Sequence, residues 1–130
     1  MSRLEEIEAL ARTVIDCGFH LHREIGPGLL ESVYQAVMIA SLRERGLQVA
    51  AEVAVPIRYK GVVIDNAFKA DLIIENSLLI ELKSTERASP VHAKQVLTYL
   101  RLLKMPLGLL MNFGQPTFKQ GLQRIVNDHR

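Results

Sequence analysis

The sequence KADLIIENSLLIELK, residues 69–83, decides the fold of this chain of 130 residues. Its apolar residues form two short runs separated by the polar pair Asn76-Ser77, a pattern that predicts a β-hairpin. Three charged residues, Asp71, Glu81 and Lys83, lie within these apolar strands. An unpaired carboxylate or ammonium group is costly to bury, so we expect the three to have polar partners or to line a water-filled cleft.

The register of this hairpin determines which charges meet. Glu81 and Lys83 are two residues apart and therefore share one face of their strand. With a loop of only Asn76 and Ser77, Asp71 would lie on the face opposite Glu81, and both faces would carry charge. One further loop residue, or a bulge, places Asp71 beside Glu81. Because a one-residue slip moves every side chain to the other face, we expect this second register, which separates charged from apolar residues. Its apolar face consists of Leu72, Ile74, Leu78, Ile80 and Leu82.

Capping residues and apolar spacing predict three helices before the last strand. Ser2 and Glu5 have the spacing of a capping box, and apolar residues recur behind them every three or four positions until Gly26-Pro27-Gly28. A second helix follows this turn and ends at Gly46. Ser89-Pro90 predicts the start of a third helix.

The other segments have strand signals, except the C-terminal segment, which has helical spacing. From Val49 the apolar period is two, and Pro56 suits an edge strand because it cannot donate a backbone hydrogen bond. After a tight turn at Lys60-Gly61, we expect a second strand from about Phe68. Residues 107–111 are uniformly apolar, as in a strand covered on both faces. Helical spacing predicts a last amphipathic helix from these residues: Phe118, Leu122, Ile125 and Val126.

These elements predict an α/β protein with the order ααβββαβα. We expect one domain over residues 1–130, with an N-terminal helix in residues 1–25 and the core in residues 26–128. The strand–helix–strand unit from Leu78 to Met111 should join parallel strands by a right-handed crossover. The expected architecture is a central mixed four-stranded sheet flanked by helices.

Composition narrows the classes of function. The residues are 48% hydrophobic and 23% charged, which argues against disorder and fibrous repeats. A net charge of +2 means that any nucleic-acid-binding surface must be local. The single cysteine, Cys17, excludes an intramolecular disulfide and a zinc site of several thiolates. Short apolar runs and an acidic N-terminus predict a cytoplasmic protein with no membrane partner.

The charged strand residues indicate a site for a hard divalent cation. Asp71 and Glu81 offer oxygen ligands, which together with retained waters suit Mg²⁺ or Mn²⁺. Lys83 is placed to orient a water molecule or to offset charge on a phosphoryl group. An ordinary exposed Glu–Lys pair is the alternative interpretation of Glu81 and Lys83, because E-x-K is a common pattern.

Two helices carry further candidates. Gln95 and Tyr99 are four residues apart and share a helix face, which His92 extends. We expect Gln95 to bond a metal-bound water or Lys83, and Tyr99 to bond a phosphate; a solvated glutamine and a boundary tyrosine are the alternative. Glu31, in the first turn of the second helix, is either a third carboxylate for the metal or an acid favoured by the helix dipole. Basic residues near Gln95 are candidate phosphate contacts or a solvated helix face: Arg87, Lys94 and Arg101.

At this point the sequence resembles a known family. Residues 28–34, GLLESVY, match the G-x-x-E-x-x-Y signature of a family of small prokaryotic proteins. Asp71, then Glu81-Leu82-Lys83, then Gln95 and Tyr99 resemble the PD-(D/E)XK nuclease superfamily, in the form with the Q-x-x-x-Y helix of RecB-type nuclease domains. The resemblance spans about residues 22–126, with Ala70 in place of the motif's proline.

The resemblance implies a restriction-endonuclease-like core and magnesium-dependent hydrolysis of phosphodiester bonds. It implies that Asp71, Glu81 and Glu31 are metal ligands and that Lys83 is the catalytic lysine. Gln95 would act with the catalytic groups, and the supporting residues would be Tyr99 and Tyr34.

We therefore expect a metal-dependent nuclease whose partner is nucleic acid, with DNA as the expected form. A catalytically silent module that keeps the fold and binds nucleic acid or protein is the alternative. A structural protein whose strand charges only form salt bridges is a third reading. We also expect a homodimer, because a two-strand cut requires two sites and one chain supplies one.

Overall fold

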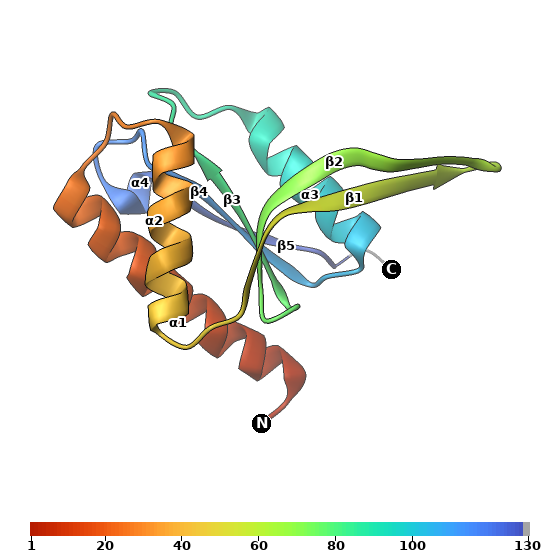
Figure 1. Ribbon diagram of the computed structural model, residues 1–130, viewed down its shortest axis with the longest axis horizontal. Helices are drawn as coiled ribbons and strands as arrows, with labels where there is room; N and C mark the ends of the chain where they lie inside the picture. Colours follow the sequence, from red (N-terminus) through yellow and green to blue (C-terminus); the bar gives the residue numbers. More distant parts are fainter. Residues whose placement is uncertain (129–130) are drawn as a thin grey trace.

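A computed structural model describes residues 1–128 (Figure 1). The helices are α1 (Arg3–Ile25), α2 (Glu31–Glu44), α3 (Pro90–Leu103) and α4 (Phe118–Gly121). The strands are β1 (Val49–Tyr59), β2 (Val62–Ile74), β3 (Leu78–Lys83), β4 (Leu107–Asn112) and β5 (Leu122–Val126). The predicted α/β class is confirmed. Within these residues no helix is both long enough and apolar enough to cross a membrane.

The five strands form one mixed sheet in the order β1-β2-β3-β4-β5. β3 and β4 are parallel, as the intervening helix predicts, and the other neighbours are antiparallel. One core lies between the sheet and helices α1 and α2, and a second lies between the sheet and α3 (Figure 1). The sheet is therefore covered on both faces.

The expected C-terminal helix is wrong. Only residues 118–121 form a helical turn, which a Thr117–Gln120 capping box begins, and the chain then continues as β5. β4 is buried at all six positions, and without β5 one of its edges would have unpaired backbone groups. β5 pairs with that edge, from Leu107 opposite Val126 to Met111 opposite Leu122. The sheet therefore has five strands and the order is ααβββαβαβ.

The hairpin register is the one that separates charged from apolar residues. Leu72 pairs with Ile80 and Ile74 with Leu78, so the loop has three residues, 75–77, and Asp71 lies opposite Glu81. All five residues of the predicted apolar face are 0% exposed and pack in the core under α1 and α2.

The β1–β2 hairpin is longer than the sequence pattern predicts. β2 begins at Val62, directly after the Lys60-Gly61 turn, in which both residues have positive φ as a type I′ turn requires. Pairing of β2 with β3 reaches only to Leu72, so residues 53–70 form a two-stranded extension that we call the arm. Figure 1 shows the arm projecting away from the body of the molecule.

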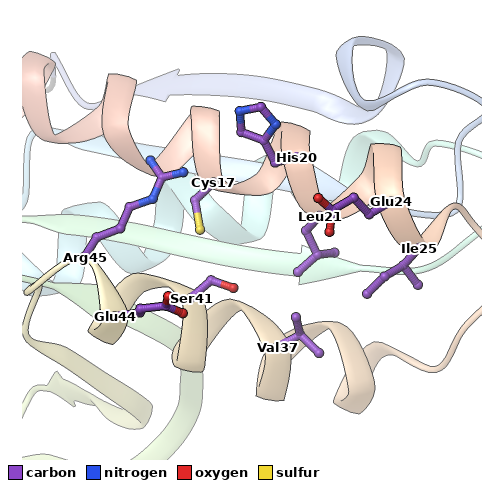
Figure 2. Close-up of a pocket in the computed structure, with 9 residues that line it drawn as sticks. All are labelled: Cys17, His20, Leu21, Glu24, Ile25, Val37, Ser41, Glu44 and Arg45. Atoms are coloured by element: carbon purple, nitrogen blue, oxygen red, sulfur yellow. The ribbon is translucent and has the colours of Figure 1, made fainter.

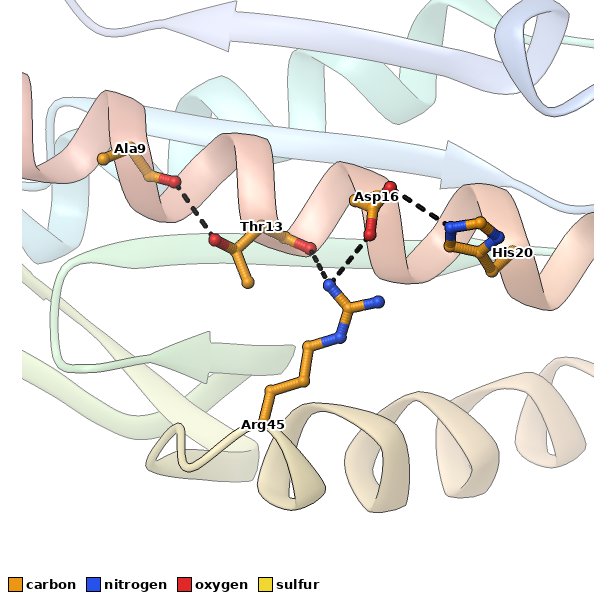
Figure 3. A network of polar contacts seen from close by, with 5 residues as sticks. All are labelled: Ala9, Thr13, Asp16, His20 and Arg45. Carbon is orange, nitrogen blue, oxygen red and sulfur yellow. Dashed lines mark hydrogen bonds and ion pairs between the residues drawn. The ribbon is translucent and has the colours of Figure 1, made fainter.

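Polar contacts at one end of α2 hold it against α1. The Arg45 guanidinium at the α2 C-cap lies 3.0 Å from the Asp16 carboxylate and donates to the Thr13 carbonyl at 3.4 Å (Figure 3). His20 also lies 3.3 Å from Asp16. The contacts of Arg45 join the two helices on the face of the sheet opposite α3, while the contact between His20 and Asp16 lies within α1.

Candidate active site

Asp71 and Glu81 form an acidic pair at the point where β2 leaves β3. The Leu82 N–H donates to Oδ2 of Asp71 at 2.8 Å, and the Asp71 N–H donates to Oε2 of Glu81 at 3.3 Å. Each carboxylate thus accepts a backbone N–H beyond the last regular pair of the ladder. These two hydrogen bonds hold the carboxylates of Asp71 and Glu81 side by side.

The acidic pair is shielded from water, which changes its protonation. Glu81 is only 5% exposed. Burial, and then a hydrogen bond with Asp71 and the charge of Asp71, raise the pKa of Glu81 to about 9, while the charge of Lys83 opposes the rise. Glu81 therefore carries a proton at neutral pH unless a cation lies against the pair.

Lys83 lies half-buried at the end of β3, two residues beyond Glu81. It pairs in register with Asn112 of β4, and its carbonyl accepts from the Phe113 N–H at 2.8 Å. The Asn112 side chain holds the next segment, because it accepts from the Thr85 N–H at 2.9 Å and donates to the Thr85 hydroxyl at 3.0 Å. Sequence reasoning missed Asn112; its signal is a buried amide at the end of an apolar strand.

Tyr99 of α3 faces the acidic pair. Its side chain is 6% exposed, and its ring lies 5.4 Å from that of Phe68 on β2. Burial, and then the charges of Glu81 and Asp71, raise the pKa of Tyr99, so the phenol stays protonated at neutral pH. Gln95, one helical turn earlier, is exposed.

The first turn of α3 lies near Lys83 and Glu31. Burial, and then the charge of Lys83, lower the pKa of His92, and the charge of Glu31 opposes this shift. Glu31 is exposed at the first position of α2. The structure therefore brings Glu31, Lys83 and His92, in the first turn of α3, to one end of the sheet.

Tyr34 supports the loop that precedes Glu31 rather than touching the acidic pair. Its hydroxyl donates to the Gly26 carbonyl at 2.5 Å and accepts from the Leu29 N–H at 3.3 Å. Its ring is 0% exposed and stacks on Phe113, with centroids 4.5 Å apart. The Ser84 hydroxyl donates to the Leu29 carbonyl at 2.5 Å, which ties this loop to the residue after Lys83.

The donor set suits a hard cation with two protein ligands. Among residues 1–128, no three His, Cys, Asp or Glu side chains lie close enough to hold one metal ion, so Glu31 does not join the acidic pair. Mg²⁺ is usually bound by one or two carboxylates together with waters and substrate phosphates. Asp71 and Glu81 meet that requirement, and a cation bound by both would offset the burial and the charge of Asp71 that raise the pKa of Glu81.

The candidate phosphate contacts are all exposed. Arg87 lies in the loop between β3 and α3, where its carbonyl accepts from the Thr85 hydroxyl at 2.9 Å. Lys94 and Arg101 lie on the exposed side of α3, with Thr98 between them. Lys94 and Arg101 thus belong to the helix that covers the acidic pair, and Arg87 lies in the loop before that helix.

A groove between α1 and α2 has a volume of 330 Å³ but lies on the other side of the sheet. Figure 2 shows the Cys17 thiol pointing from α1 toward Ser41 of α2. Cys17 is 3% exposed and belongs to the core under α1 and α2, and burial raises the pKa of the thiol. A thiol that stays protonated is a poor nucleophile, so this groove has no reactive cysteine.

Comparison with known proteins identifies one family. The model of the PD-(D/E)XK nuclease superfamily matches residues 8–125, which include most of α1, all of α2, the strands β1 to β4 and all but the last residue of β5. Comparisons with curated proteins and with solved structures find no match. The matched range includes all residues of the site described above.

Proposed function

The chain belongs to the PD-(D/E)XK nuclease superfamily, and we propose that it hydrolyses phosphodiester bonds of DNA at the acidic pair. The superfamily supports a nuclease-type function with nucleic acid as substrate, and its members generally depend on a divalent metal. The observation that carries the proposal is the position of Asp71 directly opposite Glu81, with Lys83 two residues further along β3. This order of acid, acid and lysine is the one that the superfamily's name describes.

Asp71 and Glu81 would hold Mg²⁺ or Mn²⁺ together with waters and substrate oxygens. When bound, such an ion supplies charge stabilisation to the phosphoryl group and makes a bound water more acidic. Glu81 would have to be deprotonated to act as a ligand, so cation binding at this pair would release a proton.

The remaining residues have supporting roles. Lys83 orients the attacking water and offsets the charge that develops on the phosphoryl oxygens. Tyr99, held protonated beside the pair, donates a hydrogen bond to a phosphate oxygen. Gln95 acts from the same face of α3 one turn before Tyr99, as in the Q-x-x-x-Y helix of RecB-type domains. Glu31 is a further acid at the substrate end of the site, placed by the G-x-x-E-x-x-Y segment that Tyr34 holds together.

Three exposed cations, Arg87, Lys94 and Arg101, bind backbone phosphates on either side of the reacting bond. We also propose that two copies associate when both strands of a duplex are cut, because each chain offers one acidic pair. Light scattering in the presence of a DNA duplex tests the association, and a single monomeric species at micromolar concentration contradicts it.

A catalytically silent binding module is the second candidate. The observation that favours it is that the described residues offer two carboxylates, with no third acid within reach of the same ion. Such a module would keep nucleic-acid binding and lose turnover.

Cleavage of plasmid DNA by the purified protein, with Mg²⁺ or Mn²⁺, separates the two candidates. We expect nicking that Asp71→Asn abolishes, and calorimetry should show that the same variant loses affinity for Mn²⁺. Glu75→Gln is the matched control, because Glu75 is exposed in the β2–β3 turn at the other end of these strands. Ion binding without cleavage of any DNA or RNA form would favour the silent module. Cleavage that Asp71→Asn leaves intact would place the active site elsewhere.

A further inference from the structure

The tip of the arm exposes an apolar surface. Ile57 pairs with Ile64 and Tyr59 with Val62, so these four side chains share one face. Tyr59, Val62 and Ile64 are 65%, 58% and 50% exposed. The base of the arm packs in the core under α3, where Val55 and Ala70 are 0% exposed, but a two-stranded ribbon without such packing is marginally stable in water. The tip of the arm therefore has the properties of a segment that is covered when the protein binds a partner.

The arm starts at the acidic pair. β2 runs from the arm directly into Asp71, and Phe68 at the base of the arm contacts the Tyr99 ring. From Asp71 back to the turn at Lys60-Gly61 the strand extends roughly 30 Å, at about 3.3 Å per residue. A partner that lies along the arm is therefore in contact with the proposed active site.

Positive charge is concentrated on the arm and on the α3 segment beside it. Residues 53–70 and 87–104 together contain seven basic residues and one acidic residue, a net charge of +6. The whole chain carries +2, so the remaining residues carry −4. All seven basic side chains are exposed: Arg58, Lys60, Lys69, Arg87, Lys94, Arg101 and Lys104. Such a local field attracts a polyanion.

The shape of the arm favours a duplex over a single strand. A two-stranded β-ribbon fits the major groove of B-DNA, which is about 12 Å wide. Surfaces for single strands instead use several exposed aromatic rings for base stacking. In these two segments Tyr59 is the one exposed aromatic residue, since Tyr99 is buried and Phe68 is half-buried.

A second copy of the chain fits the arm less well. A stable protein interface buries about 800 Å² on each partner, and a patch of four side chains is much smaller. Pro56 lies within the free edge strand β1 and lacks an N–H, which hinders pairing with another strand. The concentrated positive charge would also repel an identical surface.

We propose that the arm and α3 form a binding surface for double-stranded nucleic acid, in which the arm lies in a groove of the duplex and leads the backbone to the acidic pair. This inference rests on the proposed nuclease function, because in that function the surface selects double-stranded over single-stranded substrate. Duplex binding itself requires no cleavage, so the two proposals can fail separately.

Fluorescence anisotropy with a labelled 20-base-pair DNA duplex in EDTA tests the surface. We expect Arg58→Glu/Lys60→Glu to weaken duplex binding at least tenfold and to lower the slope of log affinity against log salt by about two. The matched control is Arg12→Glu/Lys119→Glu, which changes the charge equally at exposed positions on α1 and α4. We expect the control to weaken binding less than threefold, and the single strand to bind more weakly than the duplex.

Other outcomes overturn the inference. Equal losses in the two charge-reversed variants would show a general charge effect, and preferential binding of the single strand would exclude the groove. Light scattering of the native protein and of Val62→Asp addresses a second copy as occupant. A dimer that Val62→Asp dissociates without weakening duplex binding would assign the arm to self-association. Duplex binding through the arm without cleavage under any metal condition would contradict the nuclease function and leave this surface standing.

Discussion

Both faces of the central sheet are buried, but the residues that line them differ. Under α1 and α2, all five inward residues of the β2–β3 hairpin are aliphatic and 0% exposed. Under α3, Leu79 is followed on the same face by Glu81, which is 5% exposed and beside Asp71. The first face contributes stability by burying apolar surface. The second gives up stability, because it keeps two acids together in a place with little water.

Neighbouring residues at the end of β3 provide the sharpest test of this division. Lys83 lies on the charged face, and we expect Lys83→Ala to reduce the rate of DNA cleavage about 1,000-fold, or about 4 kcal/mol in the barrier. Lys83 is half-buried and has no ion pair with another residue of the range 1–128, so the melting temperature of the variant should change little. Single-turnover cleavage and calorimetric melting measure both quantities. A variant that cleaves normally would remove Lys83 from the site.

Leu82, the preceding residue, should show the opposite result. It is 0% exposed in the core under α1 and α2, so Leu82→Ala should reduce the free energy of unfolding by about 3 kcal/mol. Urea denaturation measures this loss, and cleavage per folded molecule should stay within a few-fold of the native rate. Leu102→Ala is the control, because Leu102 is 37% exposed on α3. A similar loss in the control would contradict the assignment of the core.

Glu81 should make stability depend on pH. Its pKa is about 9 in the folded protein and near 4.5 when unfolded, so the unfolded state releases its proton first as pH rises. In EDTA, the stability of the native protein should therefore fall between about pH 5 and pH 9. Glu81→Gln should remove that part of the decline and be more stable than the native protein at pH 8. If the unfolding free energies of Glu81→Gln and the native protein fell equally with pH, the decline would not come from Glu81.

The smallest expected effect concerns the loop before Glu31. Tyr34→Phe keeps the stacking on Phe113 but removes the hydrogen bonds with Gly26 and Leu29. We expect a loss of about 1 kcal/mol in unfolding free energy, together with slower cleavage as Glu31 loses its fixed position. Tyr59→Phe on the exposed arm is the control and should melt as the native protein does.

Local signals predicted most of the elements. The Ser2–Glu5 capping box and the Ser89-Pro90 start are both present at the predicted helix ends, because caps depend on neighbouring residues. The hairpin register was also predictable, since only one register keeps acids away from the aliphatic face. The acidic pair followed from that register.

Long-range requirements produced the differences from the sequence pattern. Residues 122–126 have helical spacing, yet they form β5 because the edge of β4 needs a partner. The position of Asn112 at the end of an apolar strand marks it as unusual, but its partner Thr85 lies far away in the chain, so the sequence pattern does not reveal its role. The length of the arm depends on where β3 stops pairing with β2, which spacing within β2 does not reveal.

The amino-acid sequence by itself determined the helix ends, the face of the hairpin that is apolar and the order of acid, acid and lysine, because these follow from contacts between near neighbours and from the two-residue period of a strand. Tertiary structure alone decided the fifth strand, the placement of Glu31 at the Lys83 end and the raised pKa of Glu81. Each of these depends on solvent being excluded, or on a backbone edge being satisfied, by residues distant in the chain. Burial and backbone pairing are properties of the assembled layers, so no local pattern specifies them.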